Sequence, residues 1–158
     1  MAYFIEFIDV SKSFDEKMVL DGVSFGVEEG ETFAILGPSG VGKTVTLTLA
    51  VGLFKPDKGR IIVDGEDITQ MSERELTRVR RKVQLIFQSG ALFDSLSVRE
   101  NVGFPLDDAG YTDEEIDQKV EEYLKLVEID DVADLMPSEL STGMKRAVAI
   151  ARGVAAQP

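Results

Sequence analysis

The residues best able to do chemistry lie in one stretch, from Gly37 to Thr44, which reads Gly-Pro-Ser-Gly-Val-Gly-Lys-Thr. It fits G-x-x-x-x-G-K-[ST], in which glycines let the main chain approach a phosphate group closely. Successive N–H groups form an anion nest, and the start of the next helix adds partial positive charge. In this pattern Lys43 reaches the β- and γ-phosphates and the Thr44 hydroxyl ligates Mg²⁺. The alternative is a glycine turn that contains Lys-Thr by chance.

A strand before the loop and a helix after it are the context that this pattern needs. Residues 32–36 are apolar and partly β-branched, which predicts a buried strand. Residues 45–54 are predicted to be helical, although their β-branched residues give a poor intrinsic propensity. Residues 83–87 predict a second buried strand, with Gln88 at its end. Together these elements predict an α/β core with a parallel sheet.

The other elements follow from local patterns. Residues 3–10 and 19–27 predict an antiparallel pair of strands, the second from its alternation of apolar and small or polar residues. Asp64-Gly65 between two short apolar runs predicts a type I′ hairpin turn. Three helices are predicted to begin at capping boxes, which are Ser72 with Glu75, Ser97 with Glu100, and Thr112 with Glu115.

Composition narrows the function. The 158 residues suit one domain with at most a small subdomain, and they contain no cysteine and no histidine, so the cytosol is the default compartment and zinc chemistry is disfavoured. The net charge is −12, and residues 106–134 hold twelve acidic residues against two lysines. This acidic balance argues against a nucleic-acid partner, and the run itself indicates a solvated helix face. No signal peptide or bilayer-spanning run is present in the sequence.

Three further stretches resemble the nucleotide-binding domain of ATP-binding cassette (ABC) transporters. They are the Phe87-Gln88 end of the second apolar run, the helical insert after it, and Leu140-Ser141-Thr142-Gly143-Met144. The run from Leu85 to Val102 is more similar still to ATPases of the Mla/Mce type, which serve phospholipid or other lipid trafficking. The resemblance implies a P-loop NTPase (RecA-like) α/β core with an antiparallel β subdomain and an inserted helical subdomain, the C-terminal part of the core being absent. It divides the chain at 1–89 (nucleotide-binding core), 90–140 (helical subdomain) and 141–158 (signature and its helix).

The resemblance also implies sites for ATP and Mg²⁺. Lys43 and Gln88 are the catalytic residues that it implies, and Thr44 and Gln88 are the metal ligands. The full nucleotide-binding set is Phe14, Gly37, Pro38, Ser39, Gly40, Val41, Gly42, Lys43, Thr44, Thr46, Gln88, Ser141 and Gly143. Phe14 either stacks on adenine or is an ordinary core phenylalanine. Gln88 either contacts Mg²⁺ and the attacking water or caps a strand.

The signature implies a homodimer, because in this family Ser141 and Gly143 of one subunit face the γ-phosphate held by the other. Two residues depart from the family pattern, since Thr142 replaces a glycine and Met144 replaces a glutamine. A β-branched residue disfavours positive φ, so Thr142 is expected to hinder close backbone approach. Four apolar residues after Gln88 either form the groove for a cytoplasmic helix of the membrane subunit or belong to the core; they are Ala91, Leu92, Phe93 and Leu96.

The implied function is the ATP-binding subunit of a transporter, peripheral on the cytoplasmic face of the inner membrane, bound to an integral-membrane permease and moving phospholipid or other hydrophobic cargo. The family's acidic pair and histidine, which follow the signature helix, are not among these 158 residues. We therefore expect the 158-residue polypeptide to bind nucleotide but to hydrolyse it poorly. Alternatives are a different P-loop NTPase, a soluble ABC-type protein of translation or DNA repair, and a non-catalytic nucleotide-binding or interaction module.

Overall fold

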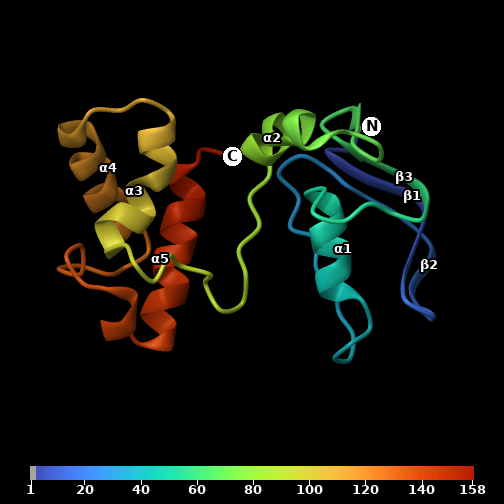
Figure 1. Ribbon diagram of the computed structural model, residues 1–158, viewed down its shortest axis with the longest axis horizontal. Helices are drawn as coiled ribbons and strands as arrows, with labels where there is room; N and C mark the ends of the chain where they lie inside the picture. The colour runs from blue at the N-terminus through green and yellow to red at the C-terminus, as the bar shows by residue number, and fades with distance from the viewer. Residues whose placement is uncertain (1–2) are drawn as a thin grey trace. The chain divides into compact units, whose positions relative to one another are not determined.

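A four-stranded antiparallel sheet and two helices form the first of two units in the computed structural model, which describes residues 3–158 (Figure 1). The sheet order is β2 (Lys17–Val27), β1 (Ile5–Phe14), β3 (Lys58–Val63) and β4 (Glu66–Asp67). The helices are α1 (Lys43–Ala50) and α2 (Glu73–Lys82). This unit extends to residue 83, and residues 84–158 form the second unit.

The predicted antiparallel pair is confirmed, with Phe7 of β1 opposite Phe25 of β2. Leu49 of α1 and Leu76 of α2 are buried with Phe7 and Ile61 of the sheet in one apolar cluster. The predicted hairpin turn is also confirmed. Asp64 and Gly65 have φ of 47° and 75°, and a type I′ turn requires positive φ at both central residues.

The two apolar segments predicted as buried parallel strands are not strands, and this prediction was wrong. Residues 31–37 and 83–87 have no regular structure, and Leu36 is 89% exposed. A strand persists only where a neighbour satisfies its N–H and C=O groups. Among the described residues the only sheet is the antiparallel one, so neither segment has a partner there. Phe33 does reach the sheet, because its ring stacks on Phe25 at 5.1 Å between centroids.

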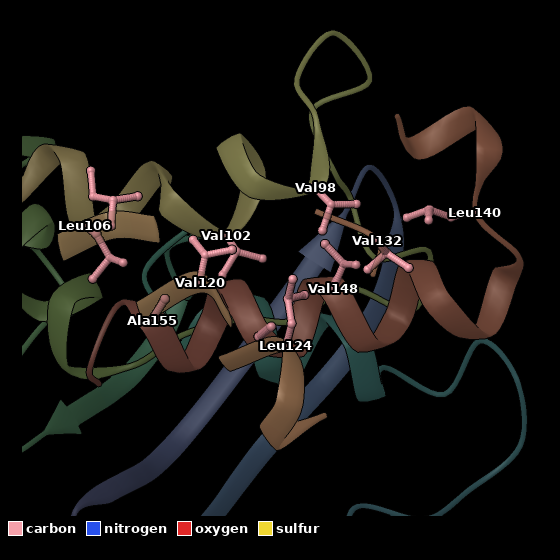
Figure 2. Close-up of a cluster of buried hydrophobic side chains, with 11 residues drawn as sticks. Val98, Val102, Leu106, Val120, Leu124, Val132, Leu140, Val148 and Ala155 are labelled. Carbon is pink, nitrogen blue, oxygen red and sulfur yellow. The ribbon is translucent and has the colours of Figure 1, made fainter. Parts of the chain in front are cut away.

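Three helices form the second unit: α3 (Val98–Asp108), α4 (Asp113–Leu126) and α5 (Thr142–Ala155), with a 3₁₀ turn, η1 (Pro137–Glu139), before α5. Figure 2 shows their shared core, with side chains of α3 and α4 gathered around Val148 of α5. On α4 the predicted stripe is buried at Ile116, Val120 and Leu124. The acidic residues of α4 lie at its exposed positions, as expected of a solvated face.

The three predicted capping boxes are all present, at the starts of α2, α3 and α4. Helix α1 begins at Lys43 and ends at Ala50, two to four residues earlier than predicted at each end. The division of the chain at 89 and 140 stays a prediction. Within residues 3–158, none of the helices combines the length and the apolar character needed to cross a bilayer.

Candidate functional site

The glycine-rich stretch leads directly into α1, as the phosphate-binding pattern requires. Gly42 is the residue that precedes the helix and has φ of 104°. A β-carbon at Gly42 would lie 3.0 Å from Leu20 Cδ2 and 3.2 Å from the Val19 carbonyl oxygen. Both the backbone angle and the space therefore demand glycine here. The first turn of α1 contains no acidic residue, so the positive end of its dipole is not compensated within that turn.

Lys43 folds back over the loop. Its Nζ lies 2.8 Å from the carbonyl oxygen of Gly37 and 2.8 Å from that of Pro38. The ammonium charge is thus held at the mouth of the loop, next to the amide groups that face an anion in this pattern. A phosphate oxygen can replace these carbonyls as the acceptor of the lysine N–H groups. The loop combines two independent sources of positive potential, the helix end and Lys43.

The two threonines of α1 have different surroundings. Thr44 lies in the first turn of the helix, and its hydroxyl is a hard oxygen donor of the kind that Mg²⁺ prefers. Thr46 is buried, and its hydroxyl donates a hydrogen bond to the Gly42 carbonyl at 3.1 Å. Thr44 therefore fits a metal-bound phosphate. The assignment of Thr46 to the nucleotide stays a prediction, since its hydroxyl bonds the helix backbone here.

Phe14 lies at the end of β1 beside the hairpin turn and is half-buried. Its ring meets Phe54 edge-on, with centroids 5.2 Å apart, and Lys12 Nζ lies 5.4 Å from its centroid. Phe14 is not a member of the buried cluster of this unit. These surroundings leave the ring only partly covered, and its stacking on adenine stays a prediction.

The remaining predicted site residues belong to the second unit. The Gln88 side chain is exposed, and the Gln88 carbonyl accepts a hydrogen bond from Arg146 Nε at 3.2 Å. Ser141 caps α5, its hydroxyl accepting from the Met144 N–H at 3.2 Å. A β-carbon at Gly143 would meet nothing closer than the Ser141 hydroxyl at 4.0 Å. This end of α5 is therefore open to a ligand or to another chain.

The expected difficulty at Thr142 does not arise, and that expectation was wrong. Thr142 is the first residue of α5 and does not have positive φ. The chain enters the helix directly from Ser141, so this position needs no left-handed backbone, and a β-branched side chain is tolerated at the exposed first turn.

The four apolar residues after Gln88 divide between the two alternatives. Leu92 packs against the buried cluster, whereas Phe93 is exposed and pairs with Phe104 at 5.1 Å between ring centroids. Phe93, Phe104 and Ala91 line a cavity of about 470 Å³ in this unit. Leu96 is half-buried and borders a different cavity.

Sequence reasoning missed Asn101, Arg146 and Arg152, which hold the loop after Gln88. Asn101 is completely buried, and Arg152 donates to the carbonyls of Gly90 and Ala91. Burial lowers the pKa of the Arg152 guanidinium. No local pattern marks these residues, because their partners are brought close only by the tertiary fold.

The geometry defines a phosphate-binding-loop protein, and comparison with known proteins gives its family. The sequence pattern of the family described as ABC transporter matches residues 20–158, so the chain belongs to that family. The ATP-binding cassette MJ0796, solved as a dimer bound to ADP and Pi, superposes with a TM-score of 0.92 at 33% identity, covering 98% of this chain and 70% of that one. The predicted fold class, a P-loop NTPase cassette, is confirmed.

Two curated relatives show the range of transport systems among similar proteins. The methionine import ATP-binding protein MetN of Legionella pneumophila (strain Lens) is 39% identical over 154 residues, covering 98% of this chain and 45% of MetN. The intermembrane phospholipid transport system ATP-binding protein MlaF of Haemophilus influenzae is 43% identical over 144 residues, covering 90% of this chain and 54% of MlaF. The chain thus spans about half the length of these relatives.

Proposed function

We propose that the chain binds MgATP at residues 37–44 as part of the ATP-binding subunit of a transporter. The observation that carries this proposal is the contact of Lys43 Nζ with the carbonyls of Gly37 and Pro38, at the mouth of a glycine loop that opens α1. This arrangement places a flexible cationic side chain and a free helix N-terminus at the same point. MgATP supplies the phosphates, with Thr44 and Gln88 as magnesium ligands and Phe14 against adenine.

The proposal extends to a homodimer in which Ser141 and Gly143 of each copy face the nucleotide of the other. The open first turn of α5 supports it, since nothing in its own unit covers Gly143. Related cassettes have been solved as dimers. We further propose an integral-membrane permease as partner, with the subunit peripheral on the inner face of the membrane.

For the cargo we propose phospholipid or another hydrophobic molecule. The run from Leu85 to Val102 and the 43% identity to the phospholipid-system protein MlaF support this choice. The 39% identity to MetN, a methionine importer, makes methionine the competing cargo. Isolation of the whole subunit with its permease from membranes, followed by transport of labelled phospholipid and labelled methionine, separates the two. Uptake of methionine alone contradicts the lipid proposal.

Calorimetric titration of the chain with MgATP tests the binding site. Lys43→Ala removes charge-assisted hydrogen bonds worth about 1.5–3 kcal/mol, so we expect MgATP affinity to fall about 10- to 100-fold. Lys125→Ala is the matched control, because Lys125 is an exposed lysine of α4 that forms an ion pair with Glu121 on its own helix. Equal affinities for the Lys43→Ala variant and the unchanged chain would rule out this site.

The same preparation tests hydrolysis. The 158 residues contain no histidine, and no acidic residue follows α5 in them. Orienting and activating the attacking water contributes orders of magnitude to phosphoryl transfer. We therefore expect phosphate release from saturating MgATP to stay far below that of a complete transport ATPase, and turnover at the rate of such an ATPase contradicts the expectation.

A further inference from the structure

Helix α5 holds the backbone of the loop after Gln88 at three points. Arg146 Nε donates to the Gln88 carbonyl at 3.2 Å, and Arg152 Nη2 donates to the carbonyls of Gly90 and Ala91 at 3.2 and 2.8 Å. The loop also approaches the helix closely, since a β-carbon at Gly90 would lie 2.9 Å from the Lys145 carbonyl oxygen. Loop and helix therefore meet backbone to backbone, with two arginines as clamps.

Asn101, at the start of α3, anchors the other side of the same loop. Its Nδ2 donates to the carbonyls of Phe93, Leu96 and Ser97 at 3.1, 2.9 and 2.9 Å. Its Oδ1 accepts from the Phe93 N–H at 2.8 Å and from Arg152 Nη1 at 3.4 Å. Asn101 is fully buried, so each of these bonds is sheltered from water. The amide joins α3, the loop and the α5 arginine in one network.

The loop is held in a conformation that it does not prefer. Gly90 and Ala91 have φ of 84° and 44°, and left-handed backbone costs about 1–2 kcal/mol at a residue with a β-carbon. Such strain persists where the surroundings over-determine the conformation, and it concentrates at functional segments. The partly buried Arg152 guanidinium bonds the carbonyls of both residues and lies 5.4 Å from the Phe93 ring centroid.

We propose that Asn101 and Arg152 are positioning residues that make α5 and the loop from Gln88 to Ser97 one rigid body. One end of α5 follows Ser141, which the proposed function places against the nucleotide of a second subunit. Arg152 lies near the other end of this 14-residue helix, which is about 21 Å long. Engagement of Ser141 therefore shifts the clamped loop as well, and with it Phe93 in the cavity shared with Phe104. The inference rests on the proposed function, because it takes Ser141 as a nucleotide contact.

The core of the unit supports rigid movement. In Figure 2, Val148 of α5 lies among apolar side chains that include Val98 and Val102 of α3. Asn101 sits between these two valines in sequence and is fixed on the same helix. A shift of α5 is thus transmitted to α3 and the loop by packing and hydrogen bonds together.

A tryptophan reporter tests this inference in the full chain, whose 158 residues contain no tryptophan. Phe93→Trp places the reporter in the loop and keeps an aromatic ring under Arg152. Asn101→Asp keeps the side-chain shape but cannot donate to the three carbonyls, and Arg152→Lys keeps the charge but loses the forked geometry. Arg99→Gln is the matched control, since Arg99 lies on α3 but bonds Asp117 of α4.

Each of these three changes is made in the Phe93→Trp background. For every resulting protein, MgATP affinity, thermal stability and acrylamide quenching of the reporter fluorescence with and without MgATP are measured. We expect MgATP affinity to stay within about twofold throughout, because the changes are remote from residues 37–44 in sequence and lie in the other unit. The MgATP-induced change in quenching should persist with Arg99→Gln and fall at least about fivefold with Asn101→Asp and with Arg152→Lys, as loss of coupling between sites predicts.

An undiminished quenching response in both Asn101→Asp and Arg152→Lys, even with lowered melting temperatures, would overturn the inference. So would a reporter whose fluorescence ignores MgATP although MgATP binds. Failure of MgATP to bind at all overturns the proposed function itself, and the titration identifies that case.

Discussion

Replacement of Val148 by alanine should selectively destabilise the helical unit. Val148 is 0% exposed in the middle of α5, within the cluster drawn in Figure 2. Loss of two buried methyl groups removes about 1.6 kcal/mol of transfer free energy. If the surrounding side chains do not move, a cavity of about 50 Å³ adds about 1.2 kcal/mol. The expected loss in free energy of unfolding therefore lies between about 1.5 and 3 kcal/mol.

Urea denaturation followed by tyrosine fluorescence measures this loss, because two of the three tyrosines, Tyr111 and Tyr123, lie in the second unit. Ile150→Ala is the control on the same helix. Ile150 is 43% exposed, and alanine has the higher helix propensity, so we expect a change below about 1 kcal/mol. If Ile150→Ala costs as much as Val148→Ala, the face of α5 assigned to the core is wrong.

The remaining predictions concern the loop and the helix starts. Gly42→Ala combines left-handed strain with contacts to Leu20 and Val19, so it should destabilise the first unit by more than the about 1–2 kcal/mol of strain alone and weaken MgATP binding. Gly30→Ala, whose β-carbon would meet nothing within 4 Å at φ of 75°, should cost the strain alone in the same urea titration, and equal losses contradict the steric argument. Hydrogen bonds from the Thr112 backbone N–H and side-chain hydroxyl hold the pKa of Glu115 below its ordinary 4.5. That contribution to stability is complete above pH 4.5 and is lost as pH falls through the lower, folded-state pKa. Glu115→Gln should therefore flatten the acid side of the stability profile, whereas an unchanged profile would show that the capping carboxylate is irrelevant.

Patterns whose partners lie a few residues away were predicted correctly. The capping boxes and the Asp64-Gly65 turn depend on backbone groups three residues away or fewer, so their geometry follows from the sequence alone. The glycine loop is of the same kind, because its conformation and the following helix are encoded within one stretch.

Features that depend on distant partners were not predictable in this way. An apolar run such as 32–36 becomes a strand only beside another strand, and no described segment pairs with it. Asn101 and Arg152 are ordinary residues by local pattern, and their roles arise because the fold brings the 90–97 loop against α3 and α5. Thr142 was misjudged because the family comparison suggested a backbone strain that the helix start does not impose.

The contact of Lys43 with two carbonyls of its own loop has a consequence for the heat of binding. A phosphate that takes over this ammonium replaces two existing 2.8 Å hydrogen bonds instead of adding new ones. The enthalpy that Lys43 contributes is therefore a difference between similar terms, whereas the release of ordered water from phosphate and loop appears as entropy. Calorimetry on the unchanged chain and on Lys43→Ala should differ more in affinity than in heat, which makes the loop a site where the lysine's own resting hydrogen bonds set the thermodynamic signature.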